Sequence, residues 1–242
     1  MAKELGRIDK PPADRYRSKK KLYVVPLYIS SPKMGPDYAD KCQRYWGQVE
    51  EQLSNLEDKI GYISKVFHEA VADSGKVGLD IMLQISPDSH RISSARLERG
   101  ASLEKTEDKE LVLESTDWER IFMVGFTSQK VAGIVTDAYI SATRSRYESI
   151  VKAIAESLKE GEAGVLFVRE GHMIQFPEDI EVFSVSPPAL DELTRWLRER
   201  TEQMRGAPPE QKKAPETEEK VLPKKKALQK KAKGKSKKSK ES

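Results

Sequence analysis

The three histidines are the first residues of this chain to examine for chemistry. His68 is followed by Glu69, but Ala72 stands where the zinc-protease pattern His-Glu-x-x-His needs its second histidine. His90 and His172 lie in distant segments, and their spacing does not bring three histidines together around an ion. We therefore expect no metal site and no cofactor.

The serines, the glycines and the single cysteine do not form a known catalytic pattern either. The Gly-x-Ser-x-Gly sequence of a serine hydrolase does not occur, and neither does a P-loop or a Gly-x-Gly-x-x-Gly fingerprint. Cys42 is one of a set of apolar residues that repeat at helical spacing, and this position is typical of a small buried side chain. The sequence therefore favours a non-catalytic protein and leaves an enzyme as an alternative.

Two polar clusters remain as candidate ligand-binding sites in the body of the chain. One surrounds a predicted tight turn at Glu170-Gly171, and the other lies next to His90. Their side chains could hold a small ligand or RNA, but turns and solvent-facing helices have the same polar composition for conformational reasons. An enzyme or small-ligand protein with a site at the 169–175 hairpin and His90 is thus the alternative function. The candidate residues are His90, Arg91, Arg96, Arg169, His172 and Gln175.

A run of lysines near the C-terminus gives the clearest indication of a partner. Val221–Lys240 contains ten lysines and no acidic residue. Lysine contacts phosphates as a point charge and does not read bases, so this run predicts contact with the backbone of RNA, including ribosomal RNA, or of DNA. A tail that only improves solubility is the alternative. The residues concerned are Lys224, Lys225, Lys226, Lys230, Lys231, Lys233, Lys235, Lys237, Lys238 and Lys240.

The charge distribution divides the chain into parts. The 242 residues have a net charge of +4, but Gly206–Ser242, with 13 Lys and 5 Glu, contributes +8 and leaves −4 for the remainder. A segment with this much charge buries too little apolar surface to fold, and we therefore expect 206–242 to be disordered. Pro11, Pro12 and the basic run at 19–21 predict a shorter flexible arm over 1–21. We expect residues 22–205, which we call the body, to form the folded domain.

The compartment follows from what the sequence lacks. No run of about 18 apolar residues that could span a membrane occurs. One cysteine cannot form an internal disulfide, and the first residues lack the apolar stretch of a secretory signal. We expect a protein of the reducing cytoplasm that has no contact with a membrane.

The strongest repeat in the chain has the spacing of a coiled coil. Apolar residues recur every seven positions from Ala39 to Phe67, and a second set follows three residues later, up to Ala70. This pattern predicts one long helix over about 37–73 with an apolar seam at 39–70. The seam could pair with a second predicted helix, 128–160, or with a second copy in a homodimer. A coiled-coil partner-binding or structural protein is therefore a third possible function.

The remaining apolar segments predict a small sheet. Residues 22–30, 164–169, 173–176 and 180–185 form short segments rich in β-branched side chains. Pro26 predicts that the first of them is an edge strand or carries a bulge. The turn at Glu170-Gly171 predicts a hairpin. The expected fold class is α+β, in which a long coiled-coil-like helical hairpin packs on a small, mostly antiparallel sheet.

The expected order of elements in Ser145–Arg205, helix, strand, hairpin and helix, resembles the last domain of bacterial proteins related to archaeal and eukaryotic release factors. The Gly-Gly-Gln tripeptide that carries peptide release in those factors does not occur here. The resemblance therefore implies contact with the ribosome and not hydrolysis.

Overall fold

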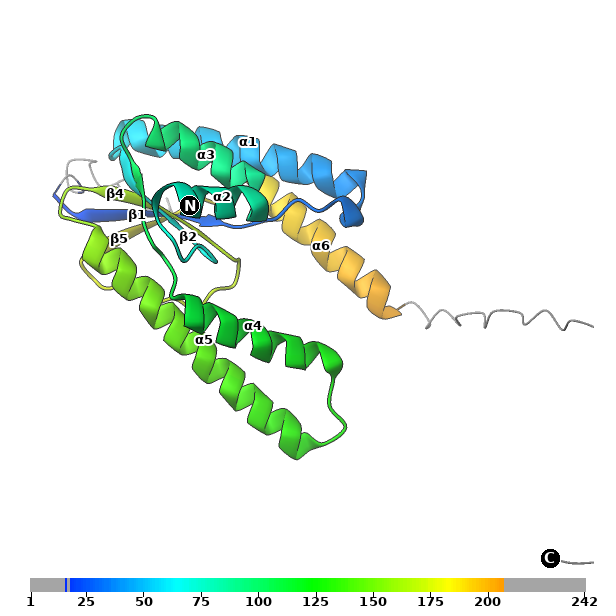
Figure 1. Cartoon of the computed structure of the whole chain (residues 1–242). Helices are drawn as coiled ribbons and strands as arrows, with labels where there is room; N and C mark the ends of the chain where they lie inside the picture. Colours follow the sequence, from blue (N-terminus) through cyan, green and yellow to red (C-terminus); the bar gives the residue numbers. More distant parts are fainter. Residues whose placement is uncertain (1–15, 17, 207–242) are drawn as a thin grey trace, which may run out of the picture. The chain divides into compact units, whose positions relative to one another are not determined.

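The computed structural model describes residues 16 and 18–206 and shows an α/β fold built on one sheet (Figure 1). The chain divides into two units after Thr201, and the fold described here is that of the first. A short 3-10 helix precedes α1 at Pro32–Met34. In chain order the other elements are β1 (Lys20–Pro26), α1 (Pro36–Lys59), β2 (Ile63–His68), α2 (Gly75–Ile85), α3 (Pro87–Leu97), β3 (Ser102–Leu103), α4 (Lys109–Val124), α5 (Gln129–Ser157), β4 (Ala163–Val168), β5 (Ile180–Ser184) and α6 (Pro188–Gly206).

The sheet is parallel throughout, so the expected α+β class with a mostly antiparallel sheet is wrong. Its five strands lie in the order β3-β2-β4-β1-β5, and every ladder between them is parallel. The burial of the strands explains this arrangement, because all six residues of β4 and the consecutive residues 21–25 of β1 are buried. A strand buried on both faces suits a sheet covered by helices on both sides, which is the usual setting of parallel strands.

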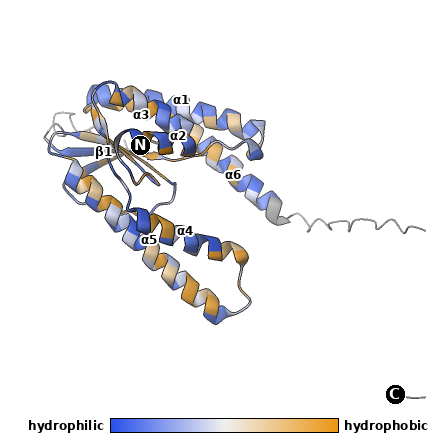
Figure 2. Ribbon diagram, in the orientation of Figure 1, coloured by the Kyte–Doolittle hydropathy of each residue, from blue (hydrophilic) through white to orange (hydrophobic). Residues whose placement is uncertain are grey.

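Two separate cores lie on the two faces of the sheet. On one face α1, α2, α3 and α6 contribute to a large core around Trp46 and Phe167. On the other face the second half of α5 packs through Ile150 and Ile154 onto Leu166. Figure 2 shows the helices with their apolar residues in orange. The sheet is therefore covered by several helices on one face and by α5 on the other.

The predicted long helix 37–73 is wrong in its second half, because it combines helix α1 with strand β2. Helix α1 ends at Lys59, and the residues that continue the heptad pattern form β2. The pattern misleads here because Ile63 and Phe67 fit a buried strand as well as a heptad seam, and Gly61 lies between the two elements. The seam is also not a free surface. Its α1 side chains, Cys42, Trp46, Val49 and Leu53, are buried in the core of their own chain.

The second predicted helix is confirmed, but it does not pair with α1. Helix α5 begins after Ser128, whose side chain accepts a hydrogen bond from the Val131 amide. Its first half packs against α4 through Val135 and Ala142, and the two helices form a hairpin (Figure 1). Its second half covers the sheet. Helix α1 lies on the opposite face of that sheet, so the predicted antiparallel pair of long helices is wrong.

The predicted hairpin after β4 is a crossover instead. Gly171, at φ +76°, turns the chain, but 172–177 do not form a strand, and β5 pairs in parallel with β1. Since β4 and β5 point the same way, the connecting residues must return along the sheet, and Ile174 packs there in the core beneath α5. Strand β1 is thus an interior strand and not an edge strand. Pro26 is tolerated because it is the last residue of β1.

The predictions for the chain termini fall mostly outside the described residues. Of the expected N-terminal arm, 1–15 and 17 are outside, whereas Lys20 and Lys21 belong to β1. The expected disordered segment lies outside from residue 207 onward. Within the described part of the chain, none of the helices is both long and apolar enough to cross a membrane.

Candidate functional site

The carboxyl ends of β2 and β4 are where a parallel sheet of this topology is expected to bind a ligand. From β2 the chain continues toward β3 at one edge, and from β4 it continues toward β5 at the other. Where neighbouring strands send their connections in opposite directions, the loops separate and leave a crevice. In this protein Glu69 follows β2 and Arg169 follows β4, so both residues lie at that point.

Glu69 joins the ends of the two strands. Its carboxylate accepts hydrogen bonds from the Arg169 amide at 2.6 Å and from Arg169 Nε at 2.5 Å. It also accepts one from Arg146 Nη2 at 3.2 Å. The residue is only 3% exposed, so these bonds provide the charge compensation that a buried carboxylate needs.

Arg146 connects Glu69 to a second buried acid, Glu107. Arg146 Nε lies 2.8 Å from Glu107 Oε2, and Nη2 lies 2.5 Å from Oε1. Glu107, which is 1% exposed, also accepts the Ala70 amide at 2.9 Å. Although burial disfavours the charged guanidinium, hydrogen bonds and charges from Glu107 and then Glu69 raise the pKa of Arg146. We call Glu69, Glu107, Arg146 and Arg169 the carboxyl-edge cluster.

The carboxyl-edge cluster holds loops together and has little capacity left for a ligand. Two acids and two bases neutralise one another, and both carboxylates accept several hydrogen bonds. The cluster joins the segments that follow β2, β3 and β4 to the middle of α5. Such paired groups suit a rigid platform better than proton transfer, which needs a group free to gain or lose a proton.

His68 lies beside this cluster in the core. Its Nε2 is 3.0 Å from Ser89 Oγ, and its Nδ1 is 2.5 Å from the Glu69 carbonyl oxygen. Burial lowers the pKa of His68 to about 4, although the Glu69 backbone and side chain act in the opposite direction. Both His68 and Ser89 are fully buried, so this histidine–serine pair cannot reach a substrate.

Ala70, next to Glu69, has a backbone conformation that favours glycine. Its φ is +68°, and among the described residues other than glycine it is the one with positive φ. The left-handed region costs a residue with a Cβ about 1–2 kcal/mol. The bonds of the neighbouring loop to the carboxyl-edge cluster hold this strained residue in place.

Replacing Ala70 by glycine should therefore stabilise the fold slightly. We expect a gain of about 0.5 kcal/mol, because relief of the strain exceeds the added entropy of the unfolded chain. Urea denaturation measures it. Ala153→Gly, inside α5, is the matched control and should cost about 1 kcal/mol. A loss of stability at both positions would contradict the assignment of strain at Ala70.

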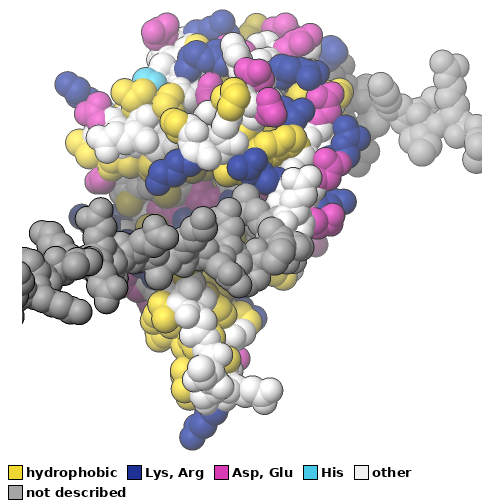
Figure 3. Space-filling model, turned by 90° about the vertical axis from the view of Figure 1, so that its right-hand side faces the viewer, with side chains coloured by type: hydrophobic (Ala, Val, Ile, Leu, Met, Phe, Trp, Pro, Cys, Tyr) yellow, Lys and Arg dark blue, Asp and Glu magenta, His cyan; other side chains and the backbone are white. Residues whose placement is uncertain are grey.

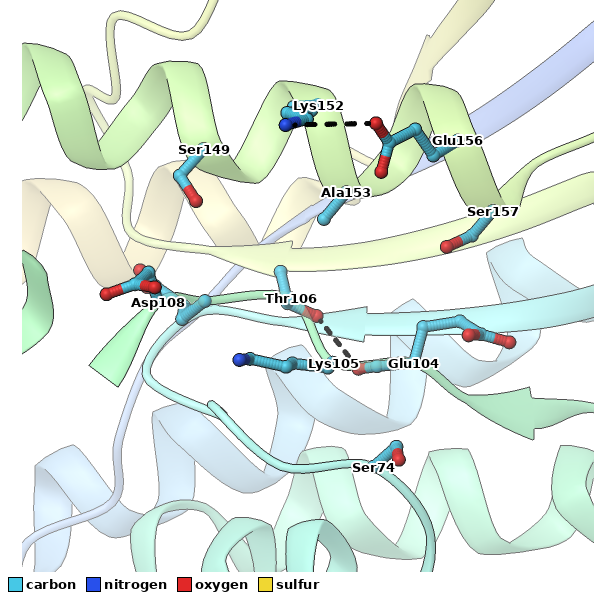
Figure 4. A pocket seen from close by; sticks show the side chains of 11 residues that line it. Ser74, Glu104, Lys105, Thr106, Asp108, Ser149, Lys152, Ala153, Glu156 and Ser157 are labelled. Atoms are coloured by element: carbon cyan, nitrogen blue, oxygen red, sulfur yellow. Dashed lines mark hydrogen bonds and ion pairs between the residues drawn. The ribbon is translucent and has the colours of Figure 1, made fainter. Parts of the chain in front are cut away.

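An open pocket borders the cluster on the α5 side (Figure 4). It has a volume of about 360 Å³ and lies between the loop after β3 and the second half of α5. Glu104 in its wall pairs with Lys65 at 2.7 Å, and Asp108 caps α4. The pocket could hold a small polar molecule. Its lining consists of Ser74, Glu104, Lys105, Thr106, Glu107, Asp108, Ser149, Lys152, Ala153, Glu156 and Ser157.

The candidate residues after β4 lie in the connection between β4 and β5. Arg169 belongs to the carboxyl-edge cluster, and Gln175 is exposed. His172 accepts the Ile174 amide at Nδ1, 3.3 Å away, and burial lowers its pKa while the charge of Glu69 opposes the shift. These residues follow β4 as a crossover loop and not as a hairpin tip.

The candidate residues around His90 lie on the other face of the sheet. They belong to α3, which packs with α1, where Arg91 pairs with Glu50. Arg96 pairs with Glu57 at 2.9 Å, and both side chains are at least 96% buried. His90 has a ring nitrogen 3.5 Å from the Ser94 hydroxyl. Because Ile174 packs in the opposite core, the structure does not bring His90 and the 169–175 segment into one site.

Of the carboxyl-edge cluster, only Arg169 is a candidate from the sequence, and sequence reasoning missed Glu69, Glu107 and Arg146 as members of a site. A charge that interrupts an apolar stripe, as Arg144 and Arg146 do in α5, indicates an acidic partner, and from the sequence the partner of Arg146 is expected on a facing helix, at Glu50, Glu51 or Glu57. The partner is instead 39 residues away in a loop. No local pattern indicates that pairing, because it depends on where β3 ends in the sheet.

Neither a metal-binding group of side chains nor a similar known protein helps to assign this site. Within the described ranges, no three histidine, cysteine, aspartate or glutamate residues are grouped so that they could hold a metal. No protein-family model matches the chain, and the searches of curated proteins and of solved structures gave no match either.

Proposed function

We propose that this protein is a non-catalytic nucleic-acid-associated protein whose Lys-rich C-terminal segment contacts the phosphates of RNA or DNA without reading the sequence. The observation that carries the proposal is the separation of charge along the chain. Gly206–Ser242 contributes +8 to the net charge, whereas the residues before it sum to −4. A polyanion is attracted to the C-terminal segment and repelled at long range by the residues that precede it.

The chemistry of the segment supports phosphate contact without base recognition. All of its cationic residues are lysines, and aromatic residues, on which bases stack, do not occur in it. Arginine, which pairs bidentately with guanine, does not occur in it either. A free, buried Cys42 fits a protein of the reducing cytoplasm, where we place this function.

The geometry of the body supports a platform more than a catalyst. The ionisable groups at the carboxyl edge are paired with one another, and the His68–Ser89 pair is enclosed in the core. A body of this kind can position the segment or a partner without chemical turnover.

The salt dependence of binding tests the proposal. If six lysines engage phosphates, log K should fall with log salt at a slope of about −4 for single strands and about −5 for duplexes. Oligonucleotides of equal length and different sequence should bind within a few-fold of one another. Fluorescence anisotropy over a salt series measures both quantities, and RNA and DNA probes identify the preferred polymer.

A variant with the ten lysines of 221–240 replaced by glutamine is the matched control, because it keeps the length of the chain. We expect the slope to become nearly zero in this variant. A slope that stays steep would place the binding site on the body and overturn the proposal. Strong preference for one base sequence would do the same.

A further inference from the structure

The α4–α5 hairpin exposes large apolar side chains that the fold does not use. Ile134 is 58% exposed, Val131 47% and Ile121 38%. Two residues at the tip, Met123 and Val124, are 83% and 86% exposed. Figure 3 shows hydrophobic side chains, in yellow, gathered along the part of the hairpin at the bottom of the view. Exposed apolar groups that cluster in this way mark interaction surfaces.

These residues do not belong to the contact between the two helices. That contact is made by Ser115, Val135 and Ala142, which are buried, and by the Phe122 ring, which lies 5.2 Å from the Tyr139 ring. Helical periodicity places the exposed residues about a quarter turn away from this contact. The contact between α4 and α5 is therefore well packed, whereas one side of the hairpin leaves apolar side chains exposed.

One side of the hairpin carries an apolar stripe to which both helices contribute. Helical periodicity places the other exposed apolar residues of the hairpin, Leu113, Met123, Val124 and Ile140, on other sides. Val131, Ile134 and Ala138 follow at spacings of three and four residues and form one stripe on α5. On the antiparallel helix α4, Ile121 and the half-buried Trp118 point to the same side. We call these five residues the hairpin face.

Charges of opposite sign flank the hairpin face. On its α4 side lie Glu110, Glu114 and Asp117, all exposed and one or two turns apart. On its α5 side lie Lys130 and Arg144, also exposed, with Asp137 between them. Asp117 forms an ion pair with Arg120 of the same helix at 3.1 Å, so the net negative charge of the α4 edge comes from Glu110 and Glu114. The α5 edge carries a net positive charge.

We propose that the hairpin face binds a second copy of this chain, so that two hairpins form an antiparallel four-helix bundle. In a two-fold symmetric interface each protomer presents the same surface to the other. A two-fold axis along the hairpin places α4 on the partner's α5, and the acidic edge of each copy then meets the basic edge of the other. The apolar side chains become the core of the bundle.

Charge complementarity is what selects a second copy over an unrelated partner. An unrelated partner would have to supply both a basic and an acidic edge at the spacing of the hairpin, whereas this chain already carries them. The inference goes beyond the proposed function and does not depend on it. It also moves the dimer contact from the buried 39–70 seam to a different pair of helices.

Sedimentation equilibrium of the full chain tests the inference. We expect a monomer–dimer equilibrium with a dissociation constant on the order of 1 μM. Ile134→Glu should raise it by about 30-fold or more and leave the circular dichroism unchanged, because the side chain is 58% exposed in the monomer. Val77→Glu on α2, where the side chain is 59% exposed, is the matched control and should dimerise normally.

A charge exchange tests the arrangement of the two helices. Glu114→Arg and Arg144→Glu should each weaken the dimer several-fold, and the two changes together should restore it, because each edge then meets its opposite again. A chain that stays monomeric at about 100 μM overturns the proposal. A dimer that tolerates Ile134→Glu, or in which the double exchange does not restore binding, overturns it as well.

Discussion

Replacing Arg146 by methionine will destabilise the protein by about 3–5 kcal/mol, the usual cost of removing one partner of a buried ion pair. Methionine keeps much of the length of the side chain but leaves Glu69 and Glu107, which are 3% and 1% exposed, without their shared cation. Glu107 then keeps the hydrogen bond from the Ala70 amide. The free energy of unfolding in urea, followed by circular dichroism, measures the effect.

Two companion variants separate this effect from a loss of packing. Arg144→Met changes an exposed arginine two residues away and should cost less than about 0.5 kcal/mol. Combining Arg146→Met with Glu107→Gln and Glu69→Gln should recover part of the lost stability, because uncompensated buried charge is then removed. If Arg144→Met and Arg146→Met cost the same, the carboxyl-edge cluster does not stabilise the fold.

Acidification should destabilise the protein through His68. The histidine titrates near its ordinary value of 6.5 in the unfolded chain, whereas burial lowers its pKa to about 4 in the fold. Between these values the unfolded state binds a proton that the native state does not, so the free energy of unfolding falls as the pH falls. A difference of this size corresponds to a loss of about 3 kcal/mol, which is complete below the folded pKa and absent above the unfolded one.

The comparison of wild type with His68→Gln isolates this contribution, since carboxylates also titrate in the acidic range. Glutamine can keep a hydrogen bond to Ser89 but does not take up a proton. The difference in unfolding free energy between pH 7 and pH 4 should therefore be about 3 kcal/mol smaller in the variant. His172→Gln, at the half-buried histidine, should retain most of the wild-type dependence. Equal pH dependence in wild type and His68→Gln would refute the assignment.

The two predictions concern the same region for a structural reason. His68, Glu69 and Ala70 follow one another at the end of β2, where the chain leaves the sheet. The His68 amide donates to Thr106 Oγ1 at 2.9 Å, and the Thr106 and Glu107 amides donate to the Val71 carbonyl. The loops after β2 and β3 are thus bonded to each other as well as to α5, and damage to one should loosen the others.

Local patterns in the sequence determined several elements of this protein. The stripe of α5 and its cap at Ser128, the helix α2 and the strands β4 and β5 can all be predicted close to their observed bounds. These elements are set by interactions within a few residues, namely the capping of the first turn and the period of the apolar side chains. The division of charge between the body and the Lys-rich segment is likewise a property of composition alone.

The tertiary structure decided what these elements do together. Strand direction and order depend on pairings such as Tyr23 with Val165, which are far apart in the chain. The residues that continue the heptad pattern at 60–70 include strand β2, because as a strand they pair with β4 and are buried on both faces of the sheet. An extension of α1 would bury these residues on one side only. A turn at Gly171 is visible in the sequence, but whether the next residues form a hairpin or a crossover depends on which strand is free to accept them.

The candidate site depended most on tertiary structure. Glu69 and Arg169 are 100 residues apart, and Arg146 reaches across 77 residues to Glu69. A charged residue in an apolar stripe indicates that a buried partner exists, because an unpaired charge cannot remain in a core. The sequence alone marked Arg144 and Arg146 alike as possible members of a pair, although Arg144 is exposed. Only the folded sheet, by placing the ends of β2, β3 and β4 side by side, decided that Arg146 is the buried one and that Glu69 and Glu107 are its partners.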